Sequence, residues 1–196
     1  MTYFERLWSE LPDAAPEHFE LRREFMLEAL APGSKVIDVG AGAGWFAAAL
    51  AGAGCSVVGV EVAQEPVRRA RERFPALEFV VVPEGRLPFA AAAFDGAWLG
   101  EVLEHVADVV GLLDEVARVL APGGRLALST PAHGWRLRLA LGVSRRAFER
   151  HFEPRADHLR FFTDATLERL LAACGFEQIA IRARSGVLLA TARAPR

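Results

Sequence analysis

Apolar and polar residues follow two periodic patterns along this chain. Short runs of nearly continuous apolar residues alternate with longer stretches in which apolar residues recur every three or four positions. The runs predict buried strands and the longer stretches predict amphipathic helices, with clusters of Gly and Pro marking the turns. Strands and helices succeed each other over residues 35–129, which is typical of a parallel sheet covered by helices on both faces. The pattern therefore predicts an α/β fold.

The bounds of the elements follow from the same pattern. Strands are predicted at residues 35–39, 56–61, 78–82, 94–99 and 125–129, and helices at 46–51, 64–73, 101–120 and 163–174. A turn is predicted at 121–124. Residues 3–30 carry a helical pattern that stops at Ala31-Pro32-Gly33. Residues 176–183 and 186–192 alternate around Arg184-Ser185-Gly186 and predict a closing hairpin.

Residues 132–160 break this rhythm. Seven arginines stand there against Glu149, Glu153 and Asp157, together with three of the five histidines. One interpretation is a lid whose arginines hold an acidic or phosphate-bearing substrate; the alternatives are a solvated helix packed on the domain and a helix docked on a membrane surface. In the lid, Arg136, Arg138, Arg145 or Arg146 would hold the substrate. Leu137, Leu141, Phe148 and Phe152 would form an apolar face of the helix. His151 and His158 could also reach the cleft.

Length and composition limit the class of protein. The 196 residues suit a single domain, 1–196, with N-terminal helices over 1–32 and an insertion at about 132–160. A net charge of −2 gives no reason to expect nucleic acid as a partner. The sequence lacks a basic start followed by an apolar stretch, and also lacks the roughly 18 apolar residues of a membrane span. We expect a cytoplasmic protein without stable membrane insertion.

The stretch after the first predicted strand carries the main chemical signal. Gly40, Gly42 and Gly44 form a tight turn between a strand and a helix. Such a turn aims backbone N–H groups and a helix N-terminus at one point, where an anionic group can bind. The signal is weak alone, because nicotinamide and flavin enzymes use a similar turn.

Three neighbouring residues indicate which ligand the turn serves. The dinucleotide fingerprint calls for Gly or Ala five residues after Gly40, where this chain has Trp45. Asp38 would repel a pyrophosphate but attract an ammonium group. Glu61 closes the second strand, where a carboxylate can accept hydrogen bonds from ribose hydroxyls. The ligand should offer a ribose, a carboxylate and an amine, and S-adenosylmethionine has all three.

Five segments in order strengthen this interpretation. They read VIDVGAGAG, GVEVAQEPVRRAR, LPF…FDGAWLGEVLEHV, RVLAPGGRLALSTP and LRFFTDATLERLLAACGF. From about residue 33 to the C-terminus the chain resembles class I S-adenosylmethionine-dependent methyltransferases of the small-molecule type, similar to the ubiquinone-biosynthesis O-methyltransferase group. The resemblance implies a Rossmann-like sheet of seven strands, order 3-2-1-4-5-7-6, with the last hairpin strand antiparallel, and S-adenosylmethionine as cofactor.

The resemblance also implies roles for individual residues around this cofactor. Family members often place an aspartate after the third strand to bind the adenine amino group; here Pro83 stands there, and either Glu84 substitutes or the contact is lost. The other positions are Asp38, Gly40, Gly42 and Gly44 at the methionine end, Glu61 on the ribose, Val62 on the adenine, and Gly100 and Glu101 beside the sulfonium.

His105 is the candidate catalytic base. It begins the predicted helix after the fourth strand, at the edge where open α/β sheets bind ligands, although a histidine at a helix start can also be structural. Glu101, Glu104 and His105 would share one helical face and could chelate a divalent metal, as the similar spacing in the ubiquinone group suggests. Two carboxylates and one imidazole are a thin ligand set, so no metal is predicted.

The chemistry predicts methyl transfer to a small-molecule acceptor. A base favours hydroxyl acceptors, and therefore O-methylation, because a hydroxyl must lose its proton. The alternatives are N-methylation of an amine or amino sugar, and a protein that binds S-adenosylmethionine without catalysis. Aromatic residues near the N-terminus, Tyr3, Phe4, Trp8 and Phe19, either close over the cofactor or belong to the core.

Overall fold

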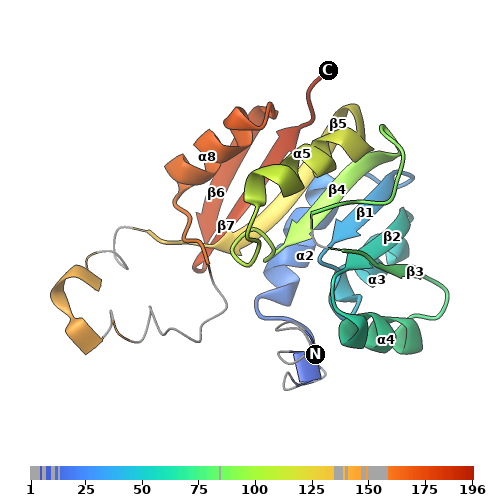
Figure 1. Cartoon of the computed structure of the whole chain (residues 1–196), viewed down its shortest axis with the longest axis horizontal. Coiled ribbons are helices and arrows are strands. Elements are labelled where there is room, and N and C mark those ends of the chain that lie inside the picture. The colour runs from blue at the N-terminus through green and yellow to red at the C-terminus, as the bar shows by residue number, and fades with distance from the viewer. Residues whose placement is uncertain are drawn as a thin grey trace.

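A computed structural model describes residues 5, 8–9, 12, 14–83, 85–134, 139, 141–146, 149 and 159–196 of the chain. Its centre is a seven-stranded sheet of order β3-β2-β1-β4-β5-β7-β6 (Figure 1). Strands β1 to β5 pair in parallel, whereas β7 runs antiparallel to both β5 and β6. The predicted fold, strand order and closing hairpin are therefore confirmed. The strands are β1 (Lys35–Val39), β2 (Ser56–Glu61), β3 (Glu78–Val81), β4 (Phe94–Gly100), β5 (Leu120–Pro131), β6 (Glu177–Arg184) and β7 (Val187–Arg193).

Two hydrophobic cores hold helices on opposite faces of this sheet. Alternate strand residues point to opposite faces: Val36 and Trp98 pack into one core, and Ile37 and Leu99 into the other. In the described part of the chain no helix is long and apolar enough to cross a membrane. The first core takes up α2 (Phe19–Ala29), α3 (Trp45–Gly52) and α4 (Gln64–Arg73), and the second takes up α5 (Val109–Val119) and α8 (Asp164–Ala173).

The turn predicted at residues 121–124 lies inside strand β5. Phe94 pairs with Leu120 but Gly96 pairs with Arg125, so β5 bulges by several residues against β4. The bulge is bonded to the end of the chain, because the backbone N–H of Ala194 donates to Gly124 O at 2.8 Å. The prediction of a separate turn before a strand at 125–129 was therefore wrong, because the strand runs from Leu120 to Pro131 and bulges at these residues.

The helix predicted from residue 101 begins only at Val109, so that prediction was wrong at its N-terminal end. Glu101 has a φ of 58°, in the left-handed region, which leads β4 into a turn instead of a helix. Asp108 then caps α5, since its side chain accepts a hydrogen bond from the Gly111 N–H at 2.9 Å. Residues 101–108 therefore form a loop at the end of β4.

Tertiary contacts hold this loop in place. The carbonyl oxygen of Glu104 accepts hydrogen bonds from the backbone N–H groups of Leu159 and Arg160, at 2.7 and 3.2 Å. The Arg160 guanidinium donates to the carbonyl oxygens of Val106 and Ala107. These carbonyl oxygens therefore accept hydrogen bonds from residues that are distant in sequence. The local pattern of apolar and polar residues does not reveal such contacts.

The Asp108 cap generates a test of this boundary. Asp108→Ala should lower the free energy of unfolding by about 1 kcal/mol, because the N-terminal N–H groups of α5 lose their acceptor. Urea denaturation of the full chain measures the change. Asp108→Asn is the matched control, since asparagine caps helices equally well; a loss as large as that of alanine would contradict the capping role.

Candidate active site

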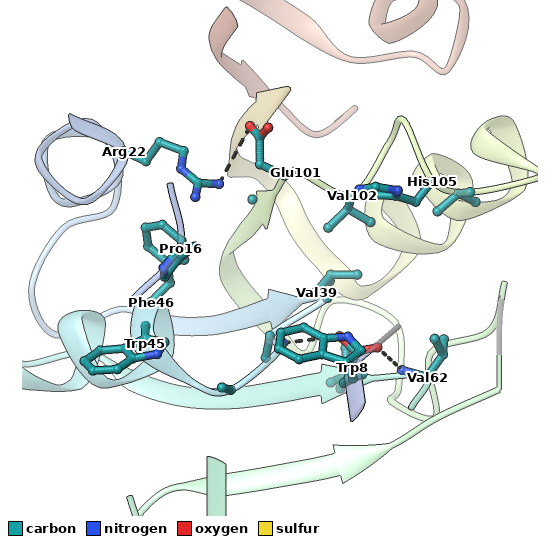
Figure 2. Close-up of a pocket in the computed structure, with 18 of the residues that line it drawn as sticks. Trp8, Pro16, Arg22, Val39, Trp45, Phe46, Val62, Glu101, Val102 and His105 are labelled. Atoms are coloured by element: carbon teal, nitrogen blue, oxygen red, sulfur yellow. Dashed lines mark hydrogen bonds and ion pairs between the residues drawn. The ribbon is translucent and has the colours of Figure 1, made fainter. Parts of the chain in front are cut away.

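A cavity of about 560 Å³ opens at the carboxyl ends of β1, β2 and β4. Figure 2 shows lining residues from the glycine turn, the end of β2, the loop after β4 and the N-terminal part of the chain. Ligands of open α/β sheets bind at this edge. Of the predicted site residues, Gly40, Gly42, Glu61, Val62, Gly100, Glu101 and His105 line the cavity.

The glycine turn is closely packed from several sides. Gly40 and Gly42 have φ values of 72° and 51°, and Gly44, at 84°, is the N-cap of α3. A Cβ on Gly40 would lie 2.5 Å from the Val102 side chain, and one on Gly42 would lie 2.9 Å from the Trp8 ring. The turn therefore requires glycine at these positions both for its backbone angles and for the approach of its neighbours.

Glu61 joins the end of β2 to this turn. Its Oε2 accepts a hydrogen bond from the Gly42 N–H at 3.2 Å, and its Oε1 accepts from the Val62 and Ala63 N–H groups at 2.7 and 3.2 Å. Burial raises the pKa of Glu61, while these backbone hydrogen bonds act in the opposite direction. A carboxylate held in this way is oriented to accept hydrogen bonds from hydroxyl groups of a ligand in the cavity.

Asp38 and Gly44 lie behind the cavity and are not among its lining residues. The Asp38 side chain is only 1% exposed, and its Oδ2 has no hydrogen-bond partner among the described residues. Burial, and after it the charge of Glu61, raises the pKa of Asp38 to about 7, although a hydrogen bond from the Ala47 backbone opposes the rise. Asp38 is therefore a buried carboxyl group at the end of β1 that is largely neutral below about pH 7.

The cavity is more exposed to solvent beyond the end of β2 than at the glycine turn. Val62 is 36% exposed at the cavity, and Pro83 and Gly85 line it from the loop after β3. Glu84 lies outside the described residues, so its predicted contact with the adenine remains a prediction.

An ion pair that the sequence analysis missed borders the opposite end of the cavity. Arg22 of α2 and Glu101 both line it, with Arg22 Nη1 3.7 Å from Glu101 Oε1. Arg22 is 3% exposed, and its guanidinium lies over the Phe46 ring at 5.1 Å. An arginine in an amphipathic helix is usually solvated, so its sequence context alone did not single it out.

His105 lies in the turn after β4 and reaches the same cavity. Its Nε2 is 3.9 Å from Oε1 of Glu104, which is 1% exposed and accepts a hydrogen bond from Thr130 Oγ1 at 2.9 Å. Burial, and after it the charge of Glu101, raises the pKa of Glu104. Because residues 101–105 are not helical, the shared helical face predicted for Glu101, Glu104 and His105 is wrong. The described residues contain no group of three acidic, His or Cys side chains arranged to hold a metal.

The insertion contributes no described residue to the cavity lining. Arg145 is exposed and pairs with Glu149 at 2.7 Å, and Arg146 is also exposed. Phe19, one of the N-terminal aromatic residues, packs on Trp45 and Phe46. The other residues predicted for the N-terminal cover and for the lid lie outside the described residues: Tyr3, Phe4, Arg136, Leu137, Arg138, Phe148, His151, Phe152 and His158.

Comparison with known proteins gives the family. Residues 12–181 match the family model described as a methyltransferase domain. The chain therefore belongs to the family of class I S-adenosylmethionine-dependent methyltransferases. It is 31% identical over 156 residues to a ubiquinone biosynthesis O-methyltransferase of Idiomarina loihiensis, covering 76% of this chain and 64% of that protein. It is 40% identical over 116 residues to a demethylmenaquinone methyltransferase of Beutenbergia cavernae, covering 57% of this chain and 48% of that protein.

Solved structures show the same fold. A phosphoethanolamine N-methyltransferase of Haemonchus contortus in complex with S-adenosyl-L-methionine superposes with a TM-score of 0.76 at 16% identity, covering 98% of this chain and 56% of that one. A methyltransferase in complex with the Trm112 activator of Haloferax volcanii gives 0.75 at 20% identity, covering 100% and 99%. This chain spans 48% to 64% of the length of the two curated relatives named above.

The cavity of this methyltransferase suits S-adenosylmethionine. Gly40 and Gly42 of its turn line the cavity, and Glu61 is oriented for hydroxyl groups. Glu101 Oε1 is buried without a hydrogen bond among the described residues, beside the buried guanidinium of Arg22. A zwitterion with a sulfonium matches both charges.

The raised pKa of Asp38 generates a prediction about stability. The folded chain keeps a proton that the unfolded chain loses near the ordinary pKa of 3.8, so the Asp38 contribution to stability is complete below that pH and is lost as the pH rises to about 7. Asp38→Asn removes the charge and keeps the shape. Its free energy of unfolding relative to wild type should therefore rise by about 2 kcal/mol between about pH 5.5 and pH 7.5.

Denaturant unfolding at several pH values measures this difference. Parallel pH profiles for the two proteins would show that Asp38 is ionised throughout, and would contradict the prediction.

Proposed function

We propose that this methyltransferase transfers a methyl group to a hydroxyl oxygen of a small molecule, with His105 as the base. The observation that carries the proposal is that His105 and the glycine turn line one cavity. S-adenosylmethionine, when bound, supplies an electrophilic methyl group on its sulfonium. In the reaction the bond from methyl carbon to acceptor oxygen forms, the bond from carbon to sulfur breaks, and the acceptor proton passes to the His105 imidazole.

The remaining site residues would hold and orient the two substrates. Much of the acceleration of a displacement comes from placing the nucleophile in line with the leaving group. Arg22 would pair with the methionine carboxylate, and Glu101 would face the cationic end of the cofactor. The proposed cofactor contacts of the other residues are Asp38, Gly40, Gly42 and Gly44 at the methionine end, Glu61 on the ribose, Val62 and Glu84 at the adenine, and Gly100 beside the sulfonium.

Names of relatives support a small-molecule acceptor. The chain is similar to proteins named for ubiquinone and menaquinone methylation and to an O-methyltransferase of Pyrenophora dematioidea, 36% identical over 135 residues. We therefore infer that the acceptor class is a small hydroxylated metabolite.

One observation favours N-methylation of an amine as a second candidate. Glu101 borders the cavity and Glu104 is buried beside His105. The Glu101 carboxylate at the cavity would attract a cationic amine as well as orient a hydroxyl group. A screen of cell metabolites with isotopically labelled methyl donor distinguishes the candidates, because the labelled product shows whether oxygen or nitrogen carries the methyl group.

Calorimetry tests the cofactor site directly. S-adenosylhomocysteine should bind the full chain, and NAD should not, because Asp38 and Trp45 disfavour a dinucleotide. Micromolar binding of NAD, or no binding of S-adenosylhomocysteine, would contradict the proposal.

The role of His105 is tested by substitution. His105→Ala should lower kcat on the acceptor by at least ~10²-fold, because the proton loses its acceptor, while the Kd of S-adenosylhomocysteine stays near that of wild type. Turnover with the acceptor found in the screen measures the first quantity and calorimetry the second. If turnover is unchanged, the histidine has a structural role and the proposed base is wrong.

A further inference from the structure

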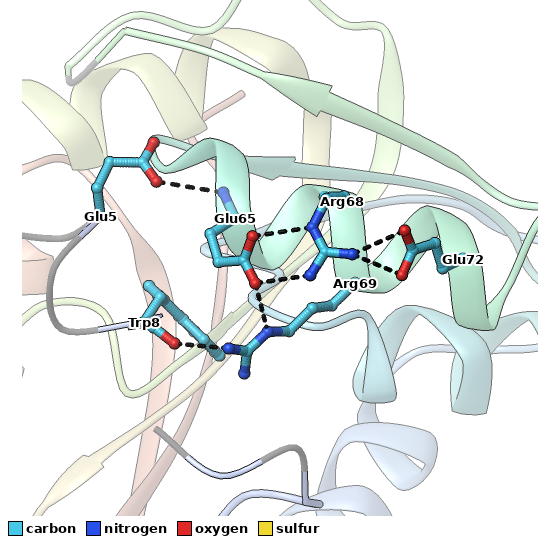
Figure 3. A network of polar contacts seen from close by, with 6 residues as sticks. All are labelled: Glu5, Trp8, Glu65, Arg68, Arg69 and Glu72. Carbon is cyan, nitrogen blue, oxygen red and sulfur yellow. Dashed lines mark hydrogen bonds and ion pairs between the residues drawn. The ribbon is translucent and has the colours of Figure 1, made fainter. Parts of the chain in front are cut away.

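The N-terminus of helix α4 has no side-chain cap from its own N-cap residue. Its N-cap residue is Ala63, whose side chain has no oxygen to accept the first N–H groups of the helix. Glu5, far away in sequence, supplies the acceptors instead. Its Oε1 accepts from the Gln64 N–H at 2.6 Å. Its Oε2 accepts from the Glu65 N–H at 3.3 Å (Figure 3). A carboxylate at this end also complements the helix dipole.

A second contact joins the N-terminal residues to the same helix. Arg69 donates through Nη2 to the backbone carbonyl oxygen of Trp8 at 2.9 Å, and through Nε to Glu65 Oε1 at 2.9 Å (Figure 3). The Arg69 side chain is 15% exposed, which makes its hydrogen bonds stronger than those of a solvated arginine. Arg69 therefore holds the backbone of Trp8, and Glu5, three residues earlier in the chain, is bonded to the same helix.

Trp8 lies against the part of the turn that faces the cofactor. Its ring carbons come within 3.0 Å of the position that a Cβ on Gly42 would take. The N–H of the same glycine donates to Glu61, so the ring covers the point where the turn and the predicted ribose-binding carboxylate meet. Figure 2 shows Trp8 among the lining residues, between Trp45 and Val62 in this view.

From these contacts we propose that Glu5 and Arg69 are positioning residues that hold Trp8 over the glycine turn, where it retains bound S-adenosylmethionine or S-adenosylhomocysteine. The inference rests on the proposed cofactor site. Trp8 touches the ligand, whereas Glu5 and Arg69 act only through Trp8. The helix they use as an anchor directly follows the strand that ends in Glu61, so the cover and the carboxylate share one rigid support.

Arg68 provides a matched control on the same helix. It donates to Glu65 and Glu72, makes no hydrogen bond with the described N-terminal residues such as Glu5 and Trp8, and has a side chain that is 54% exposed. Replacing Arg68 removes a guanidinium and the same Glu65 interaction without disturbing Trp8. A difference between Arg69 and Arg68 variants therefore reports the contact with Trp8.

The experiment measures release of S-adenosylhomocysteine from the immobilised full chain by surface plasmon resonance. Arg69→Ala and Glu5→Gln should each raise the dissociation rate constant about tenfold, the size expected for losing a charge-assisted hydrogen bond. Trp8→Ala should raise it at least as much. Arg68→Ala should leave it within about twofold of wild type. Arg69→Lys keeps one donor and should restore part of the retention.

Each outcome decides the proposal. If Arg69→Ala releases the ligand no faster than Arg68→Ala, Trp8 is not held by this contact and the proposal is wrong. A rise in the association rate alone would show that Trp8 blocks the site instead of covering it, which also overturns the proposal. Thermal unfolding without ligand separates retention from folding, since retention predicts faster release even in variants that keep the wild-type Tm. If wild type does not bind S-adenosylhomocysteine at all, the proposed cofactor site itself fails.

Discussion

The hydrogen bonds of the Glu61 carboxylate hold the cofactor site together. One oxygen binds the Gly42 N–H in the turn after β1, and the other binds the N–H groups that lead from β2 into α4. The segments that follow two adjacent parallel strands are thus both hydrogen-bonded to one buried carboxyl group. Removing that group would leave several buried N–H donors without an acceptor, which costs more than a typical solvent-exposed contact.

The same carboxylate lies close to a second acidic residue. Burial raises the pKa of Asp38, and the charge of Glu61 raises it further. Ionisation of both carboxyl groups at once is therefore unfavourable in this buried place.

The sequence predicted most of the fold because its signals were local or periodic. Nearly continuous apolar runs identified the parallel strands, and the hairpin turn identified β6 and β7. Residues predicted for the site from their place at strand ends, such as Gly42 and Glu61, do line the cavity. Long-range contacts were not accessible to the same reasoning. Arg22 reaches the cavity from α2, and Arg160 bonds to the loop at 101–108; both contacts join residues that meet only after folding.

The Arg160 contacts connect two parts of the chain that lie far apart in sequence. Arg160 is the last residue of the arginine-rich segment 132–160, and its guanidinium donates to the carbonyl oxygens of Val106 and Ala107 in the loop that carries His105. Loss of this guanidinium would therefore leave two carbonyl groups beside His105 without this donor, while the hydrogen bonds of Glu61 to the glycine turn would stay as they are.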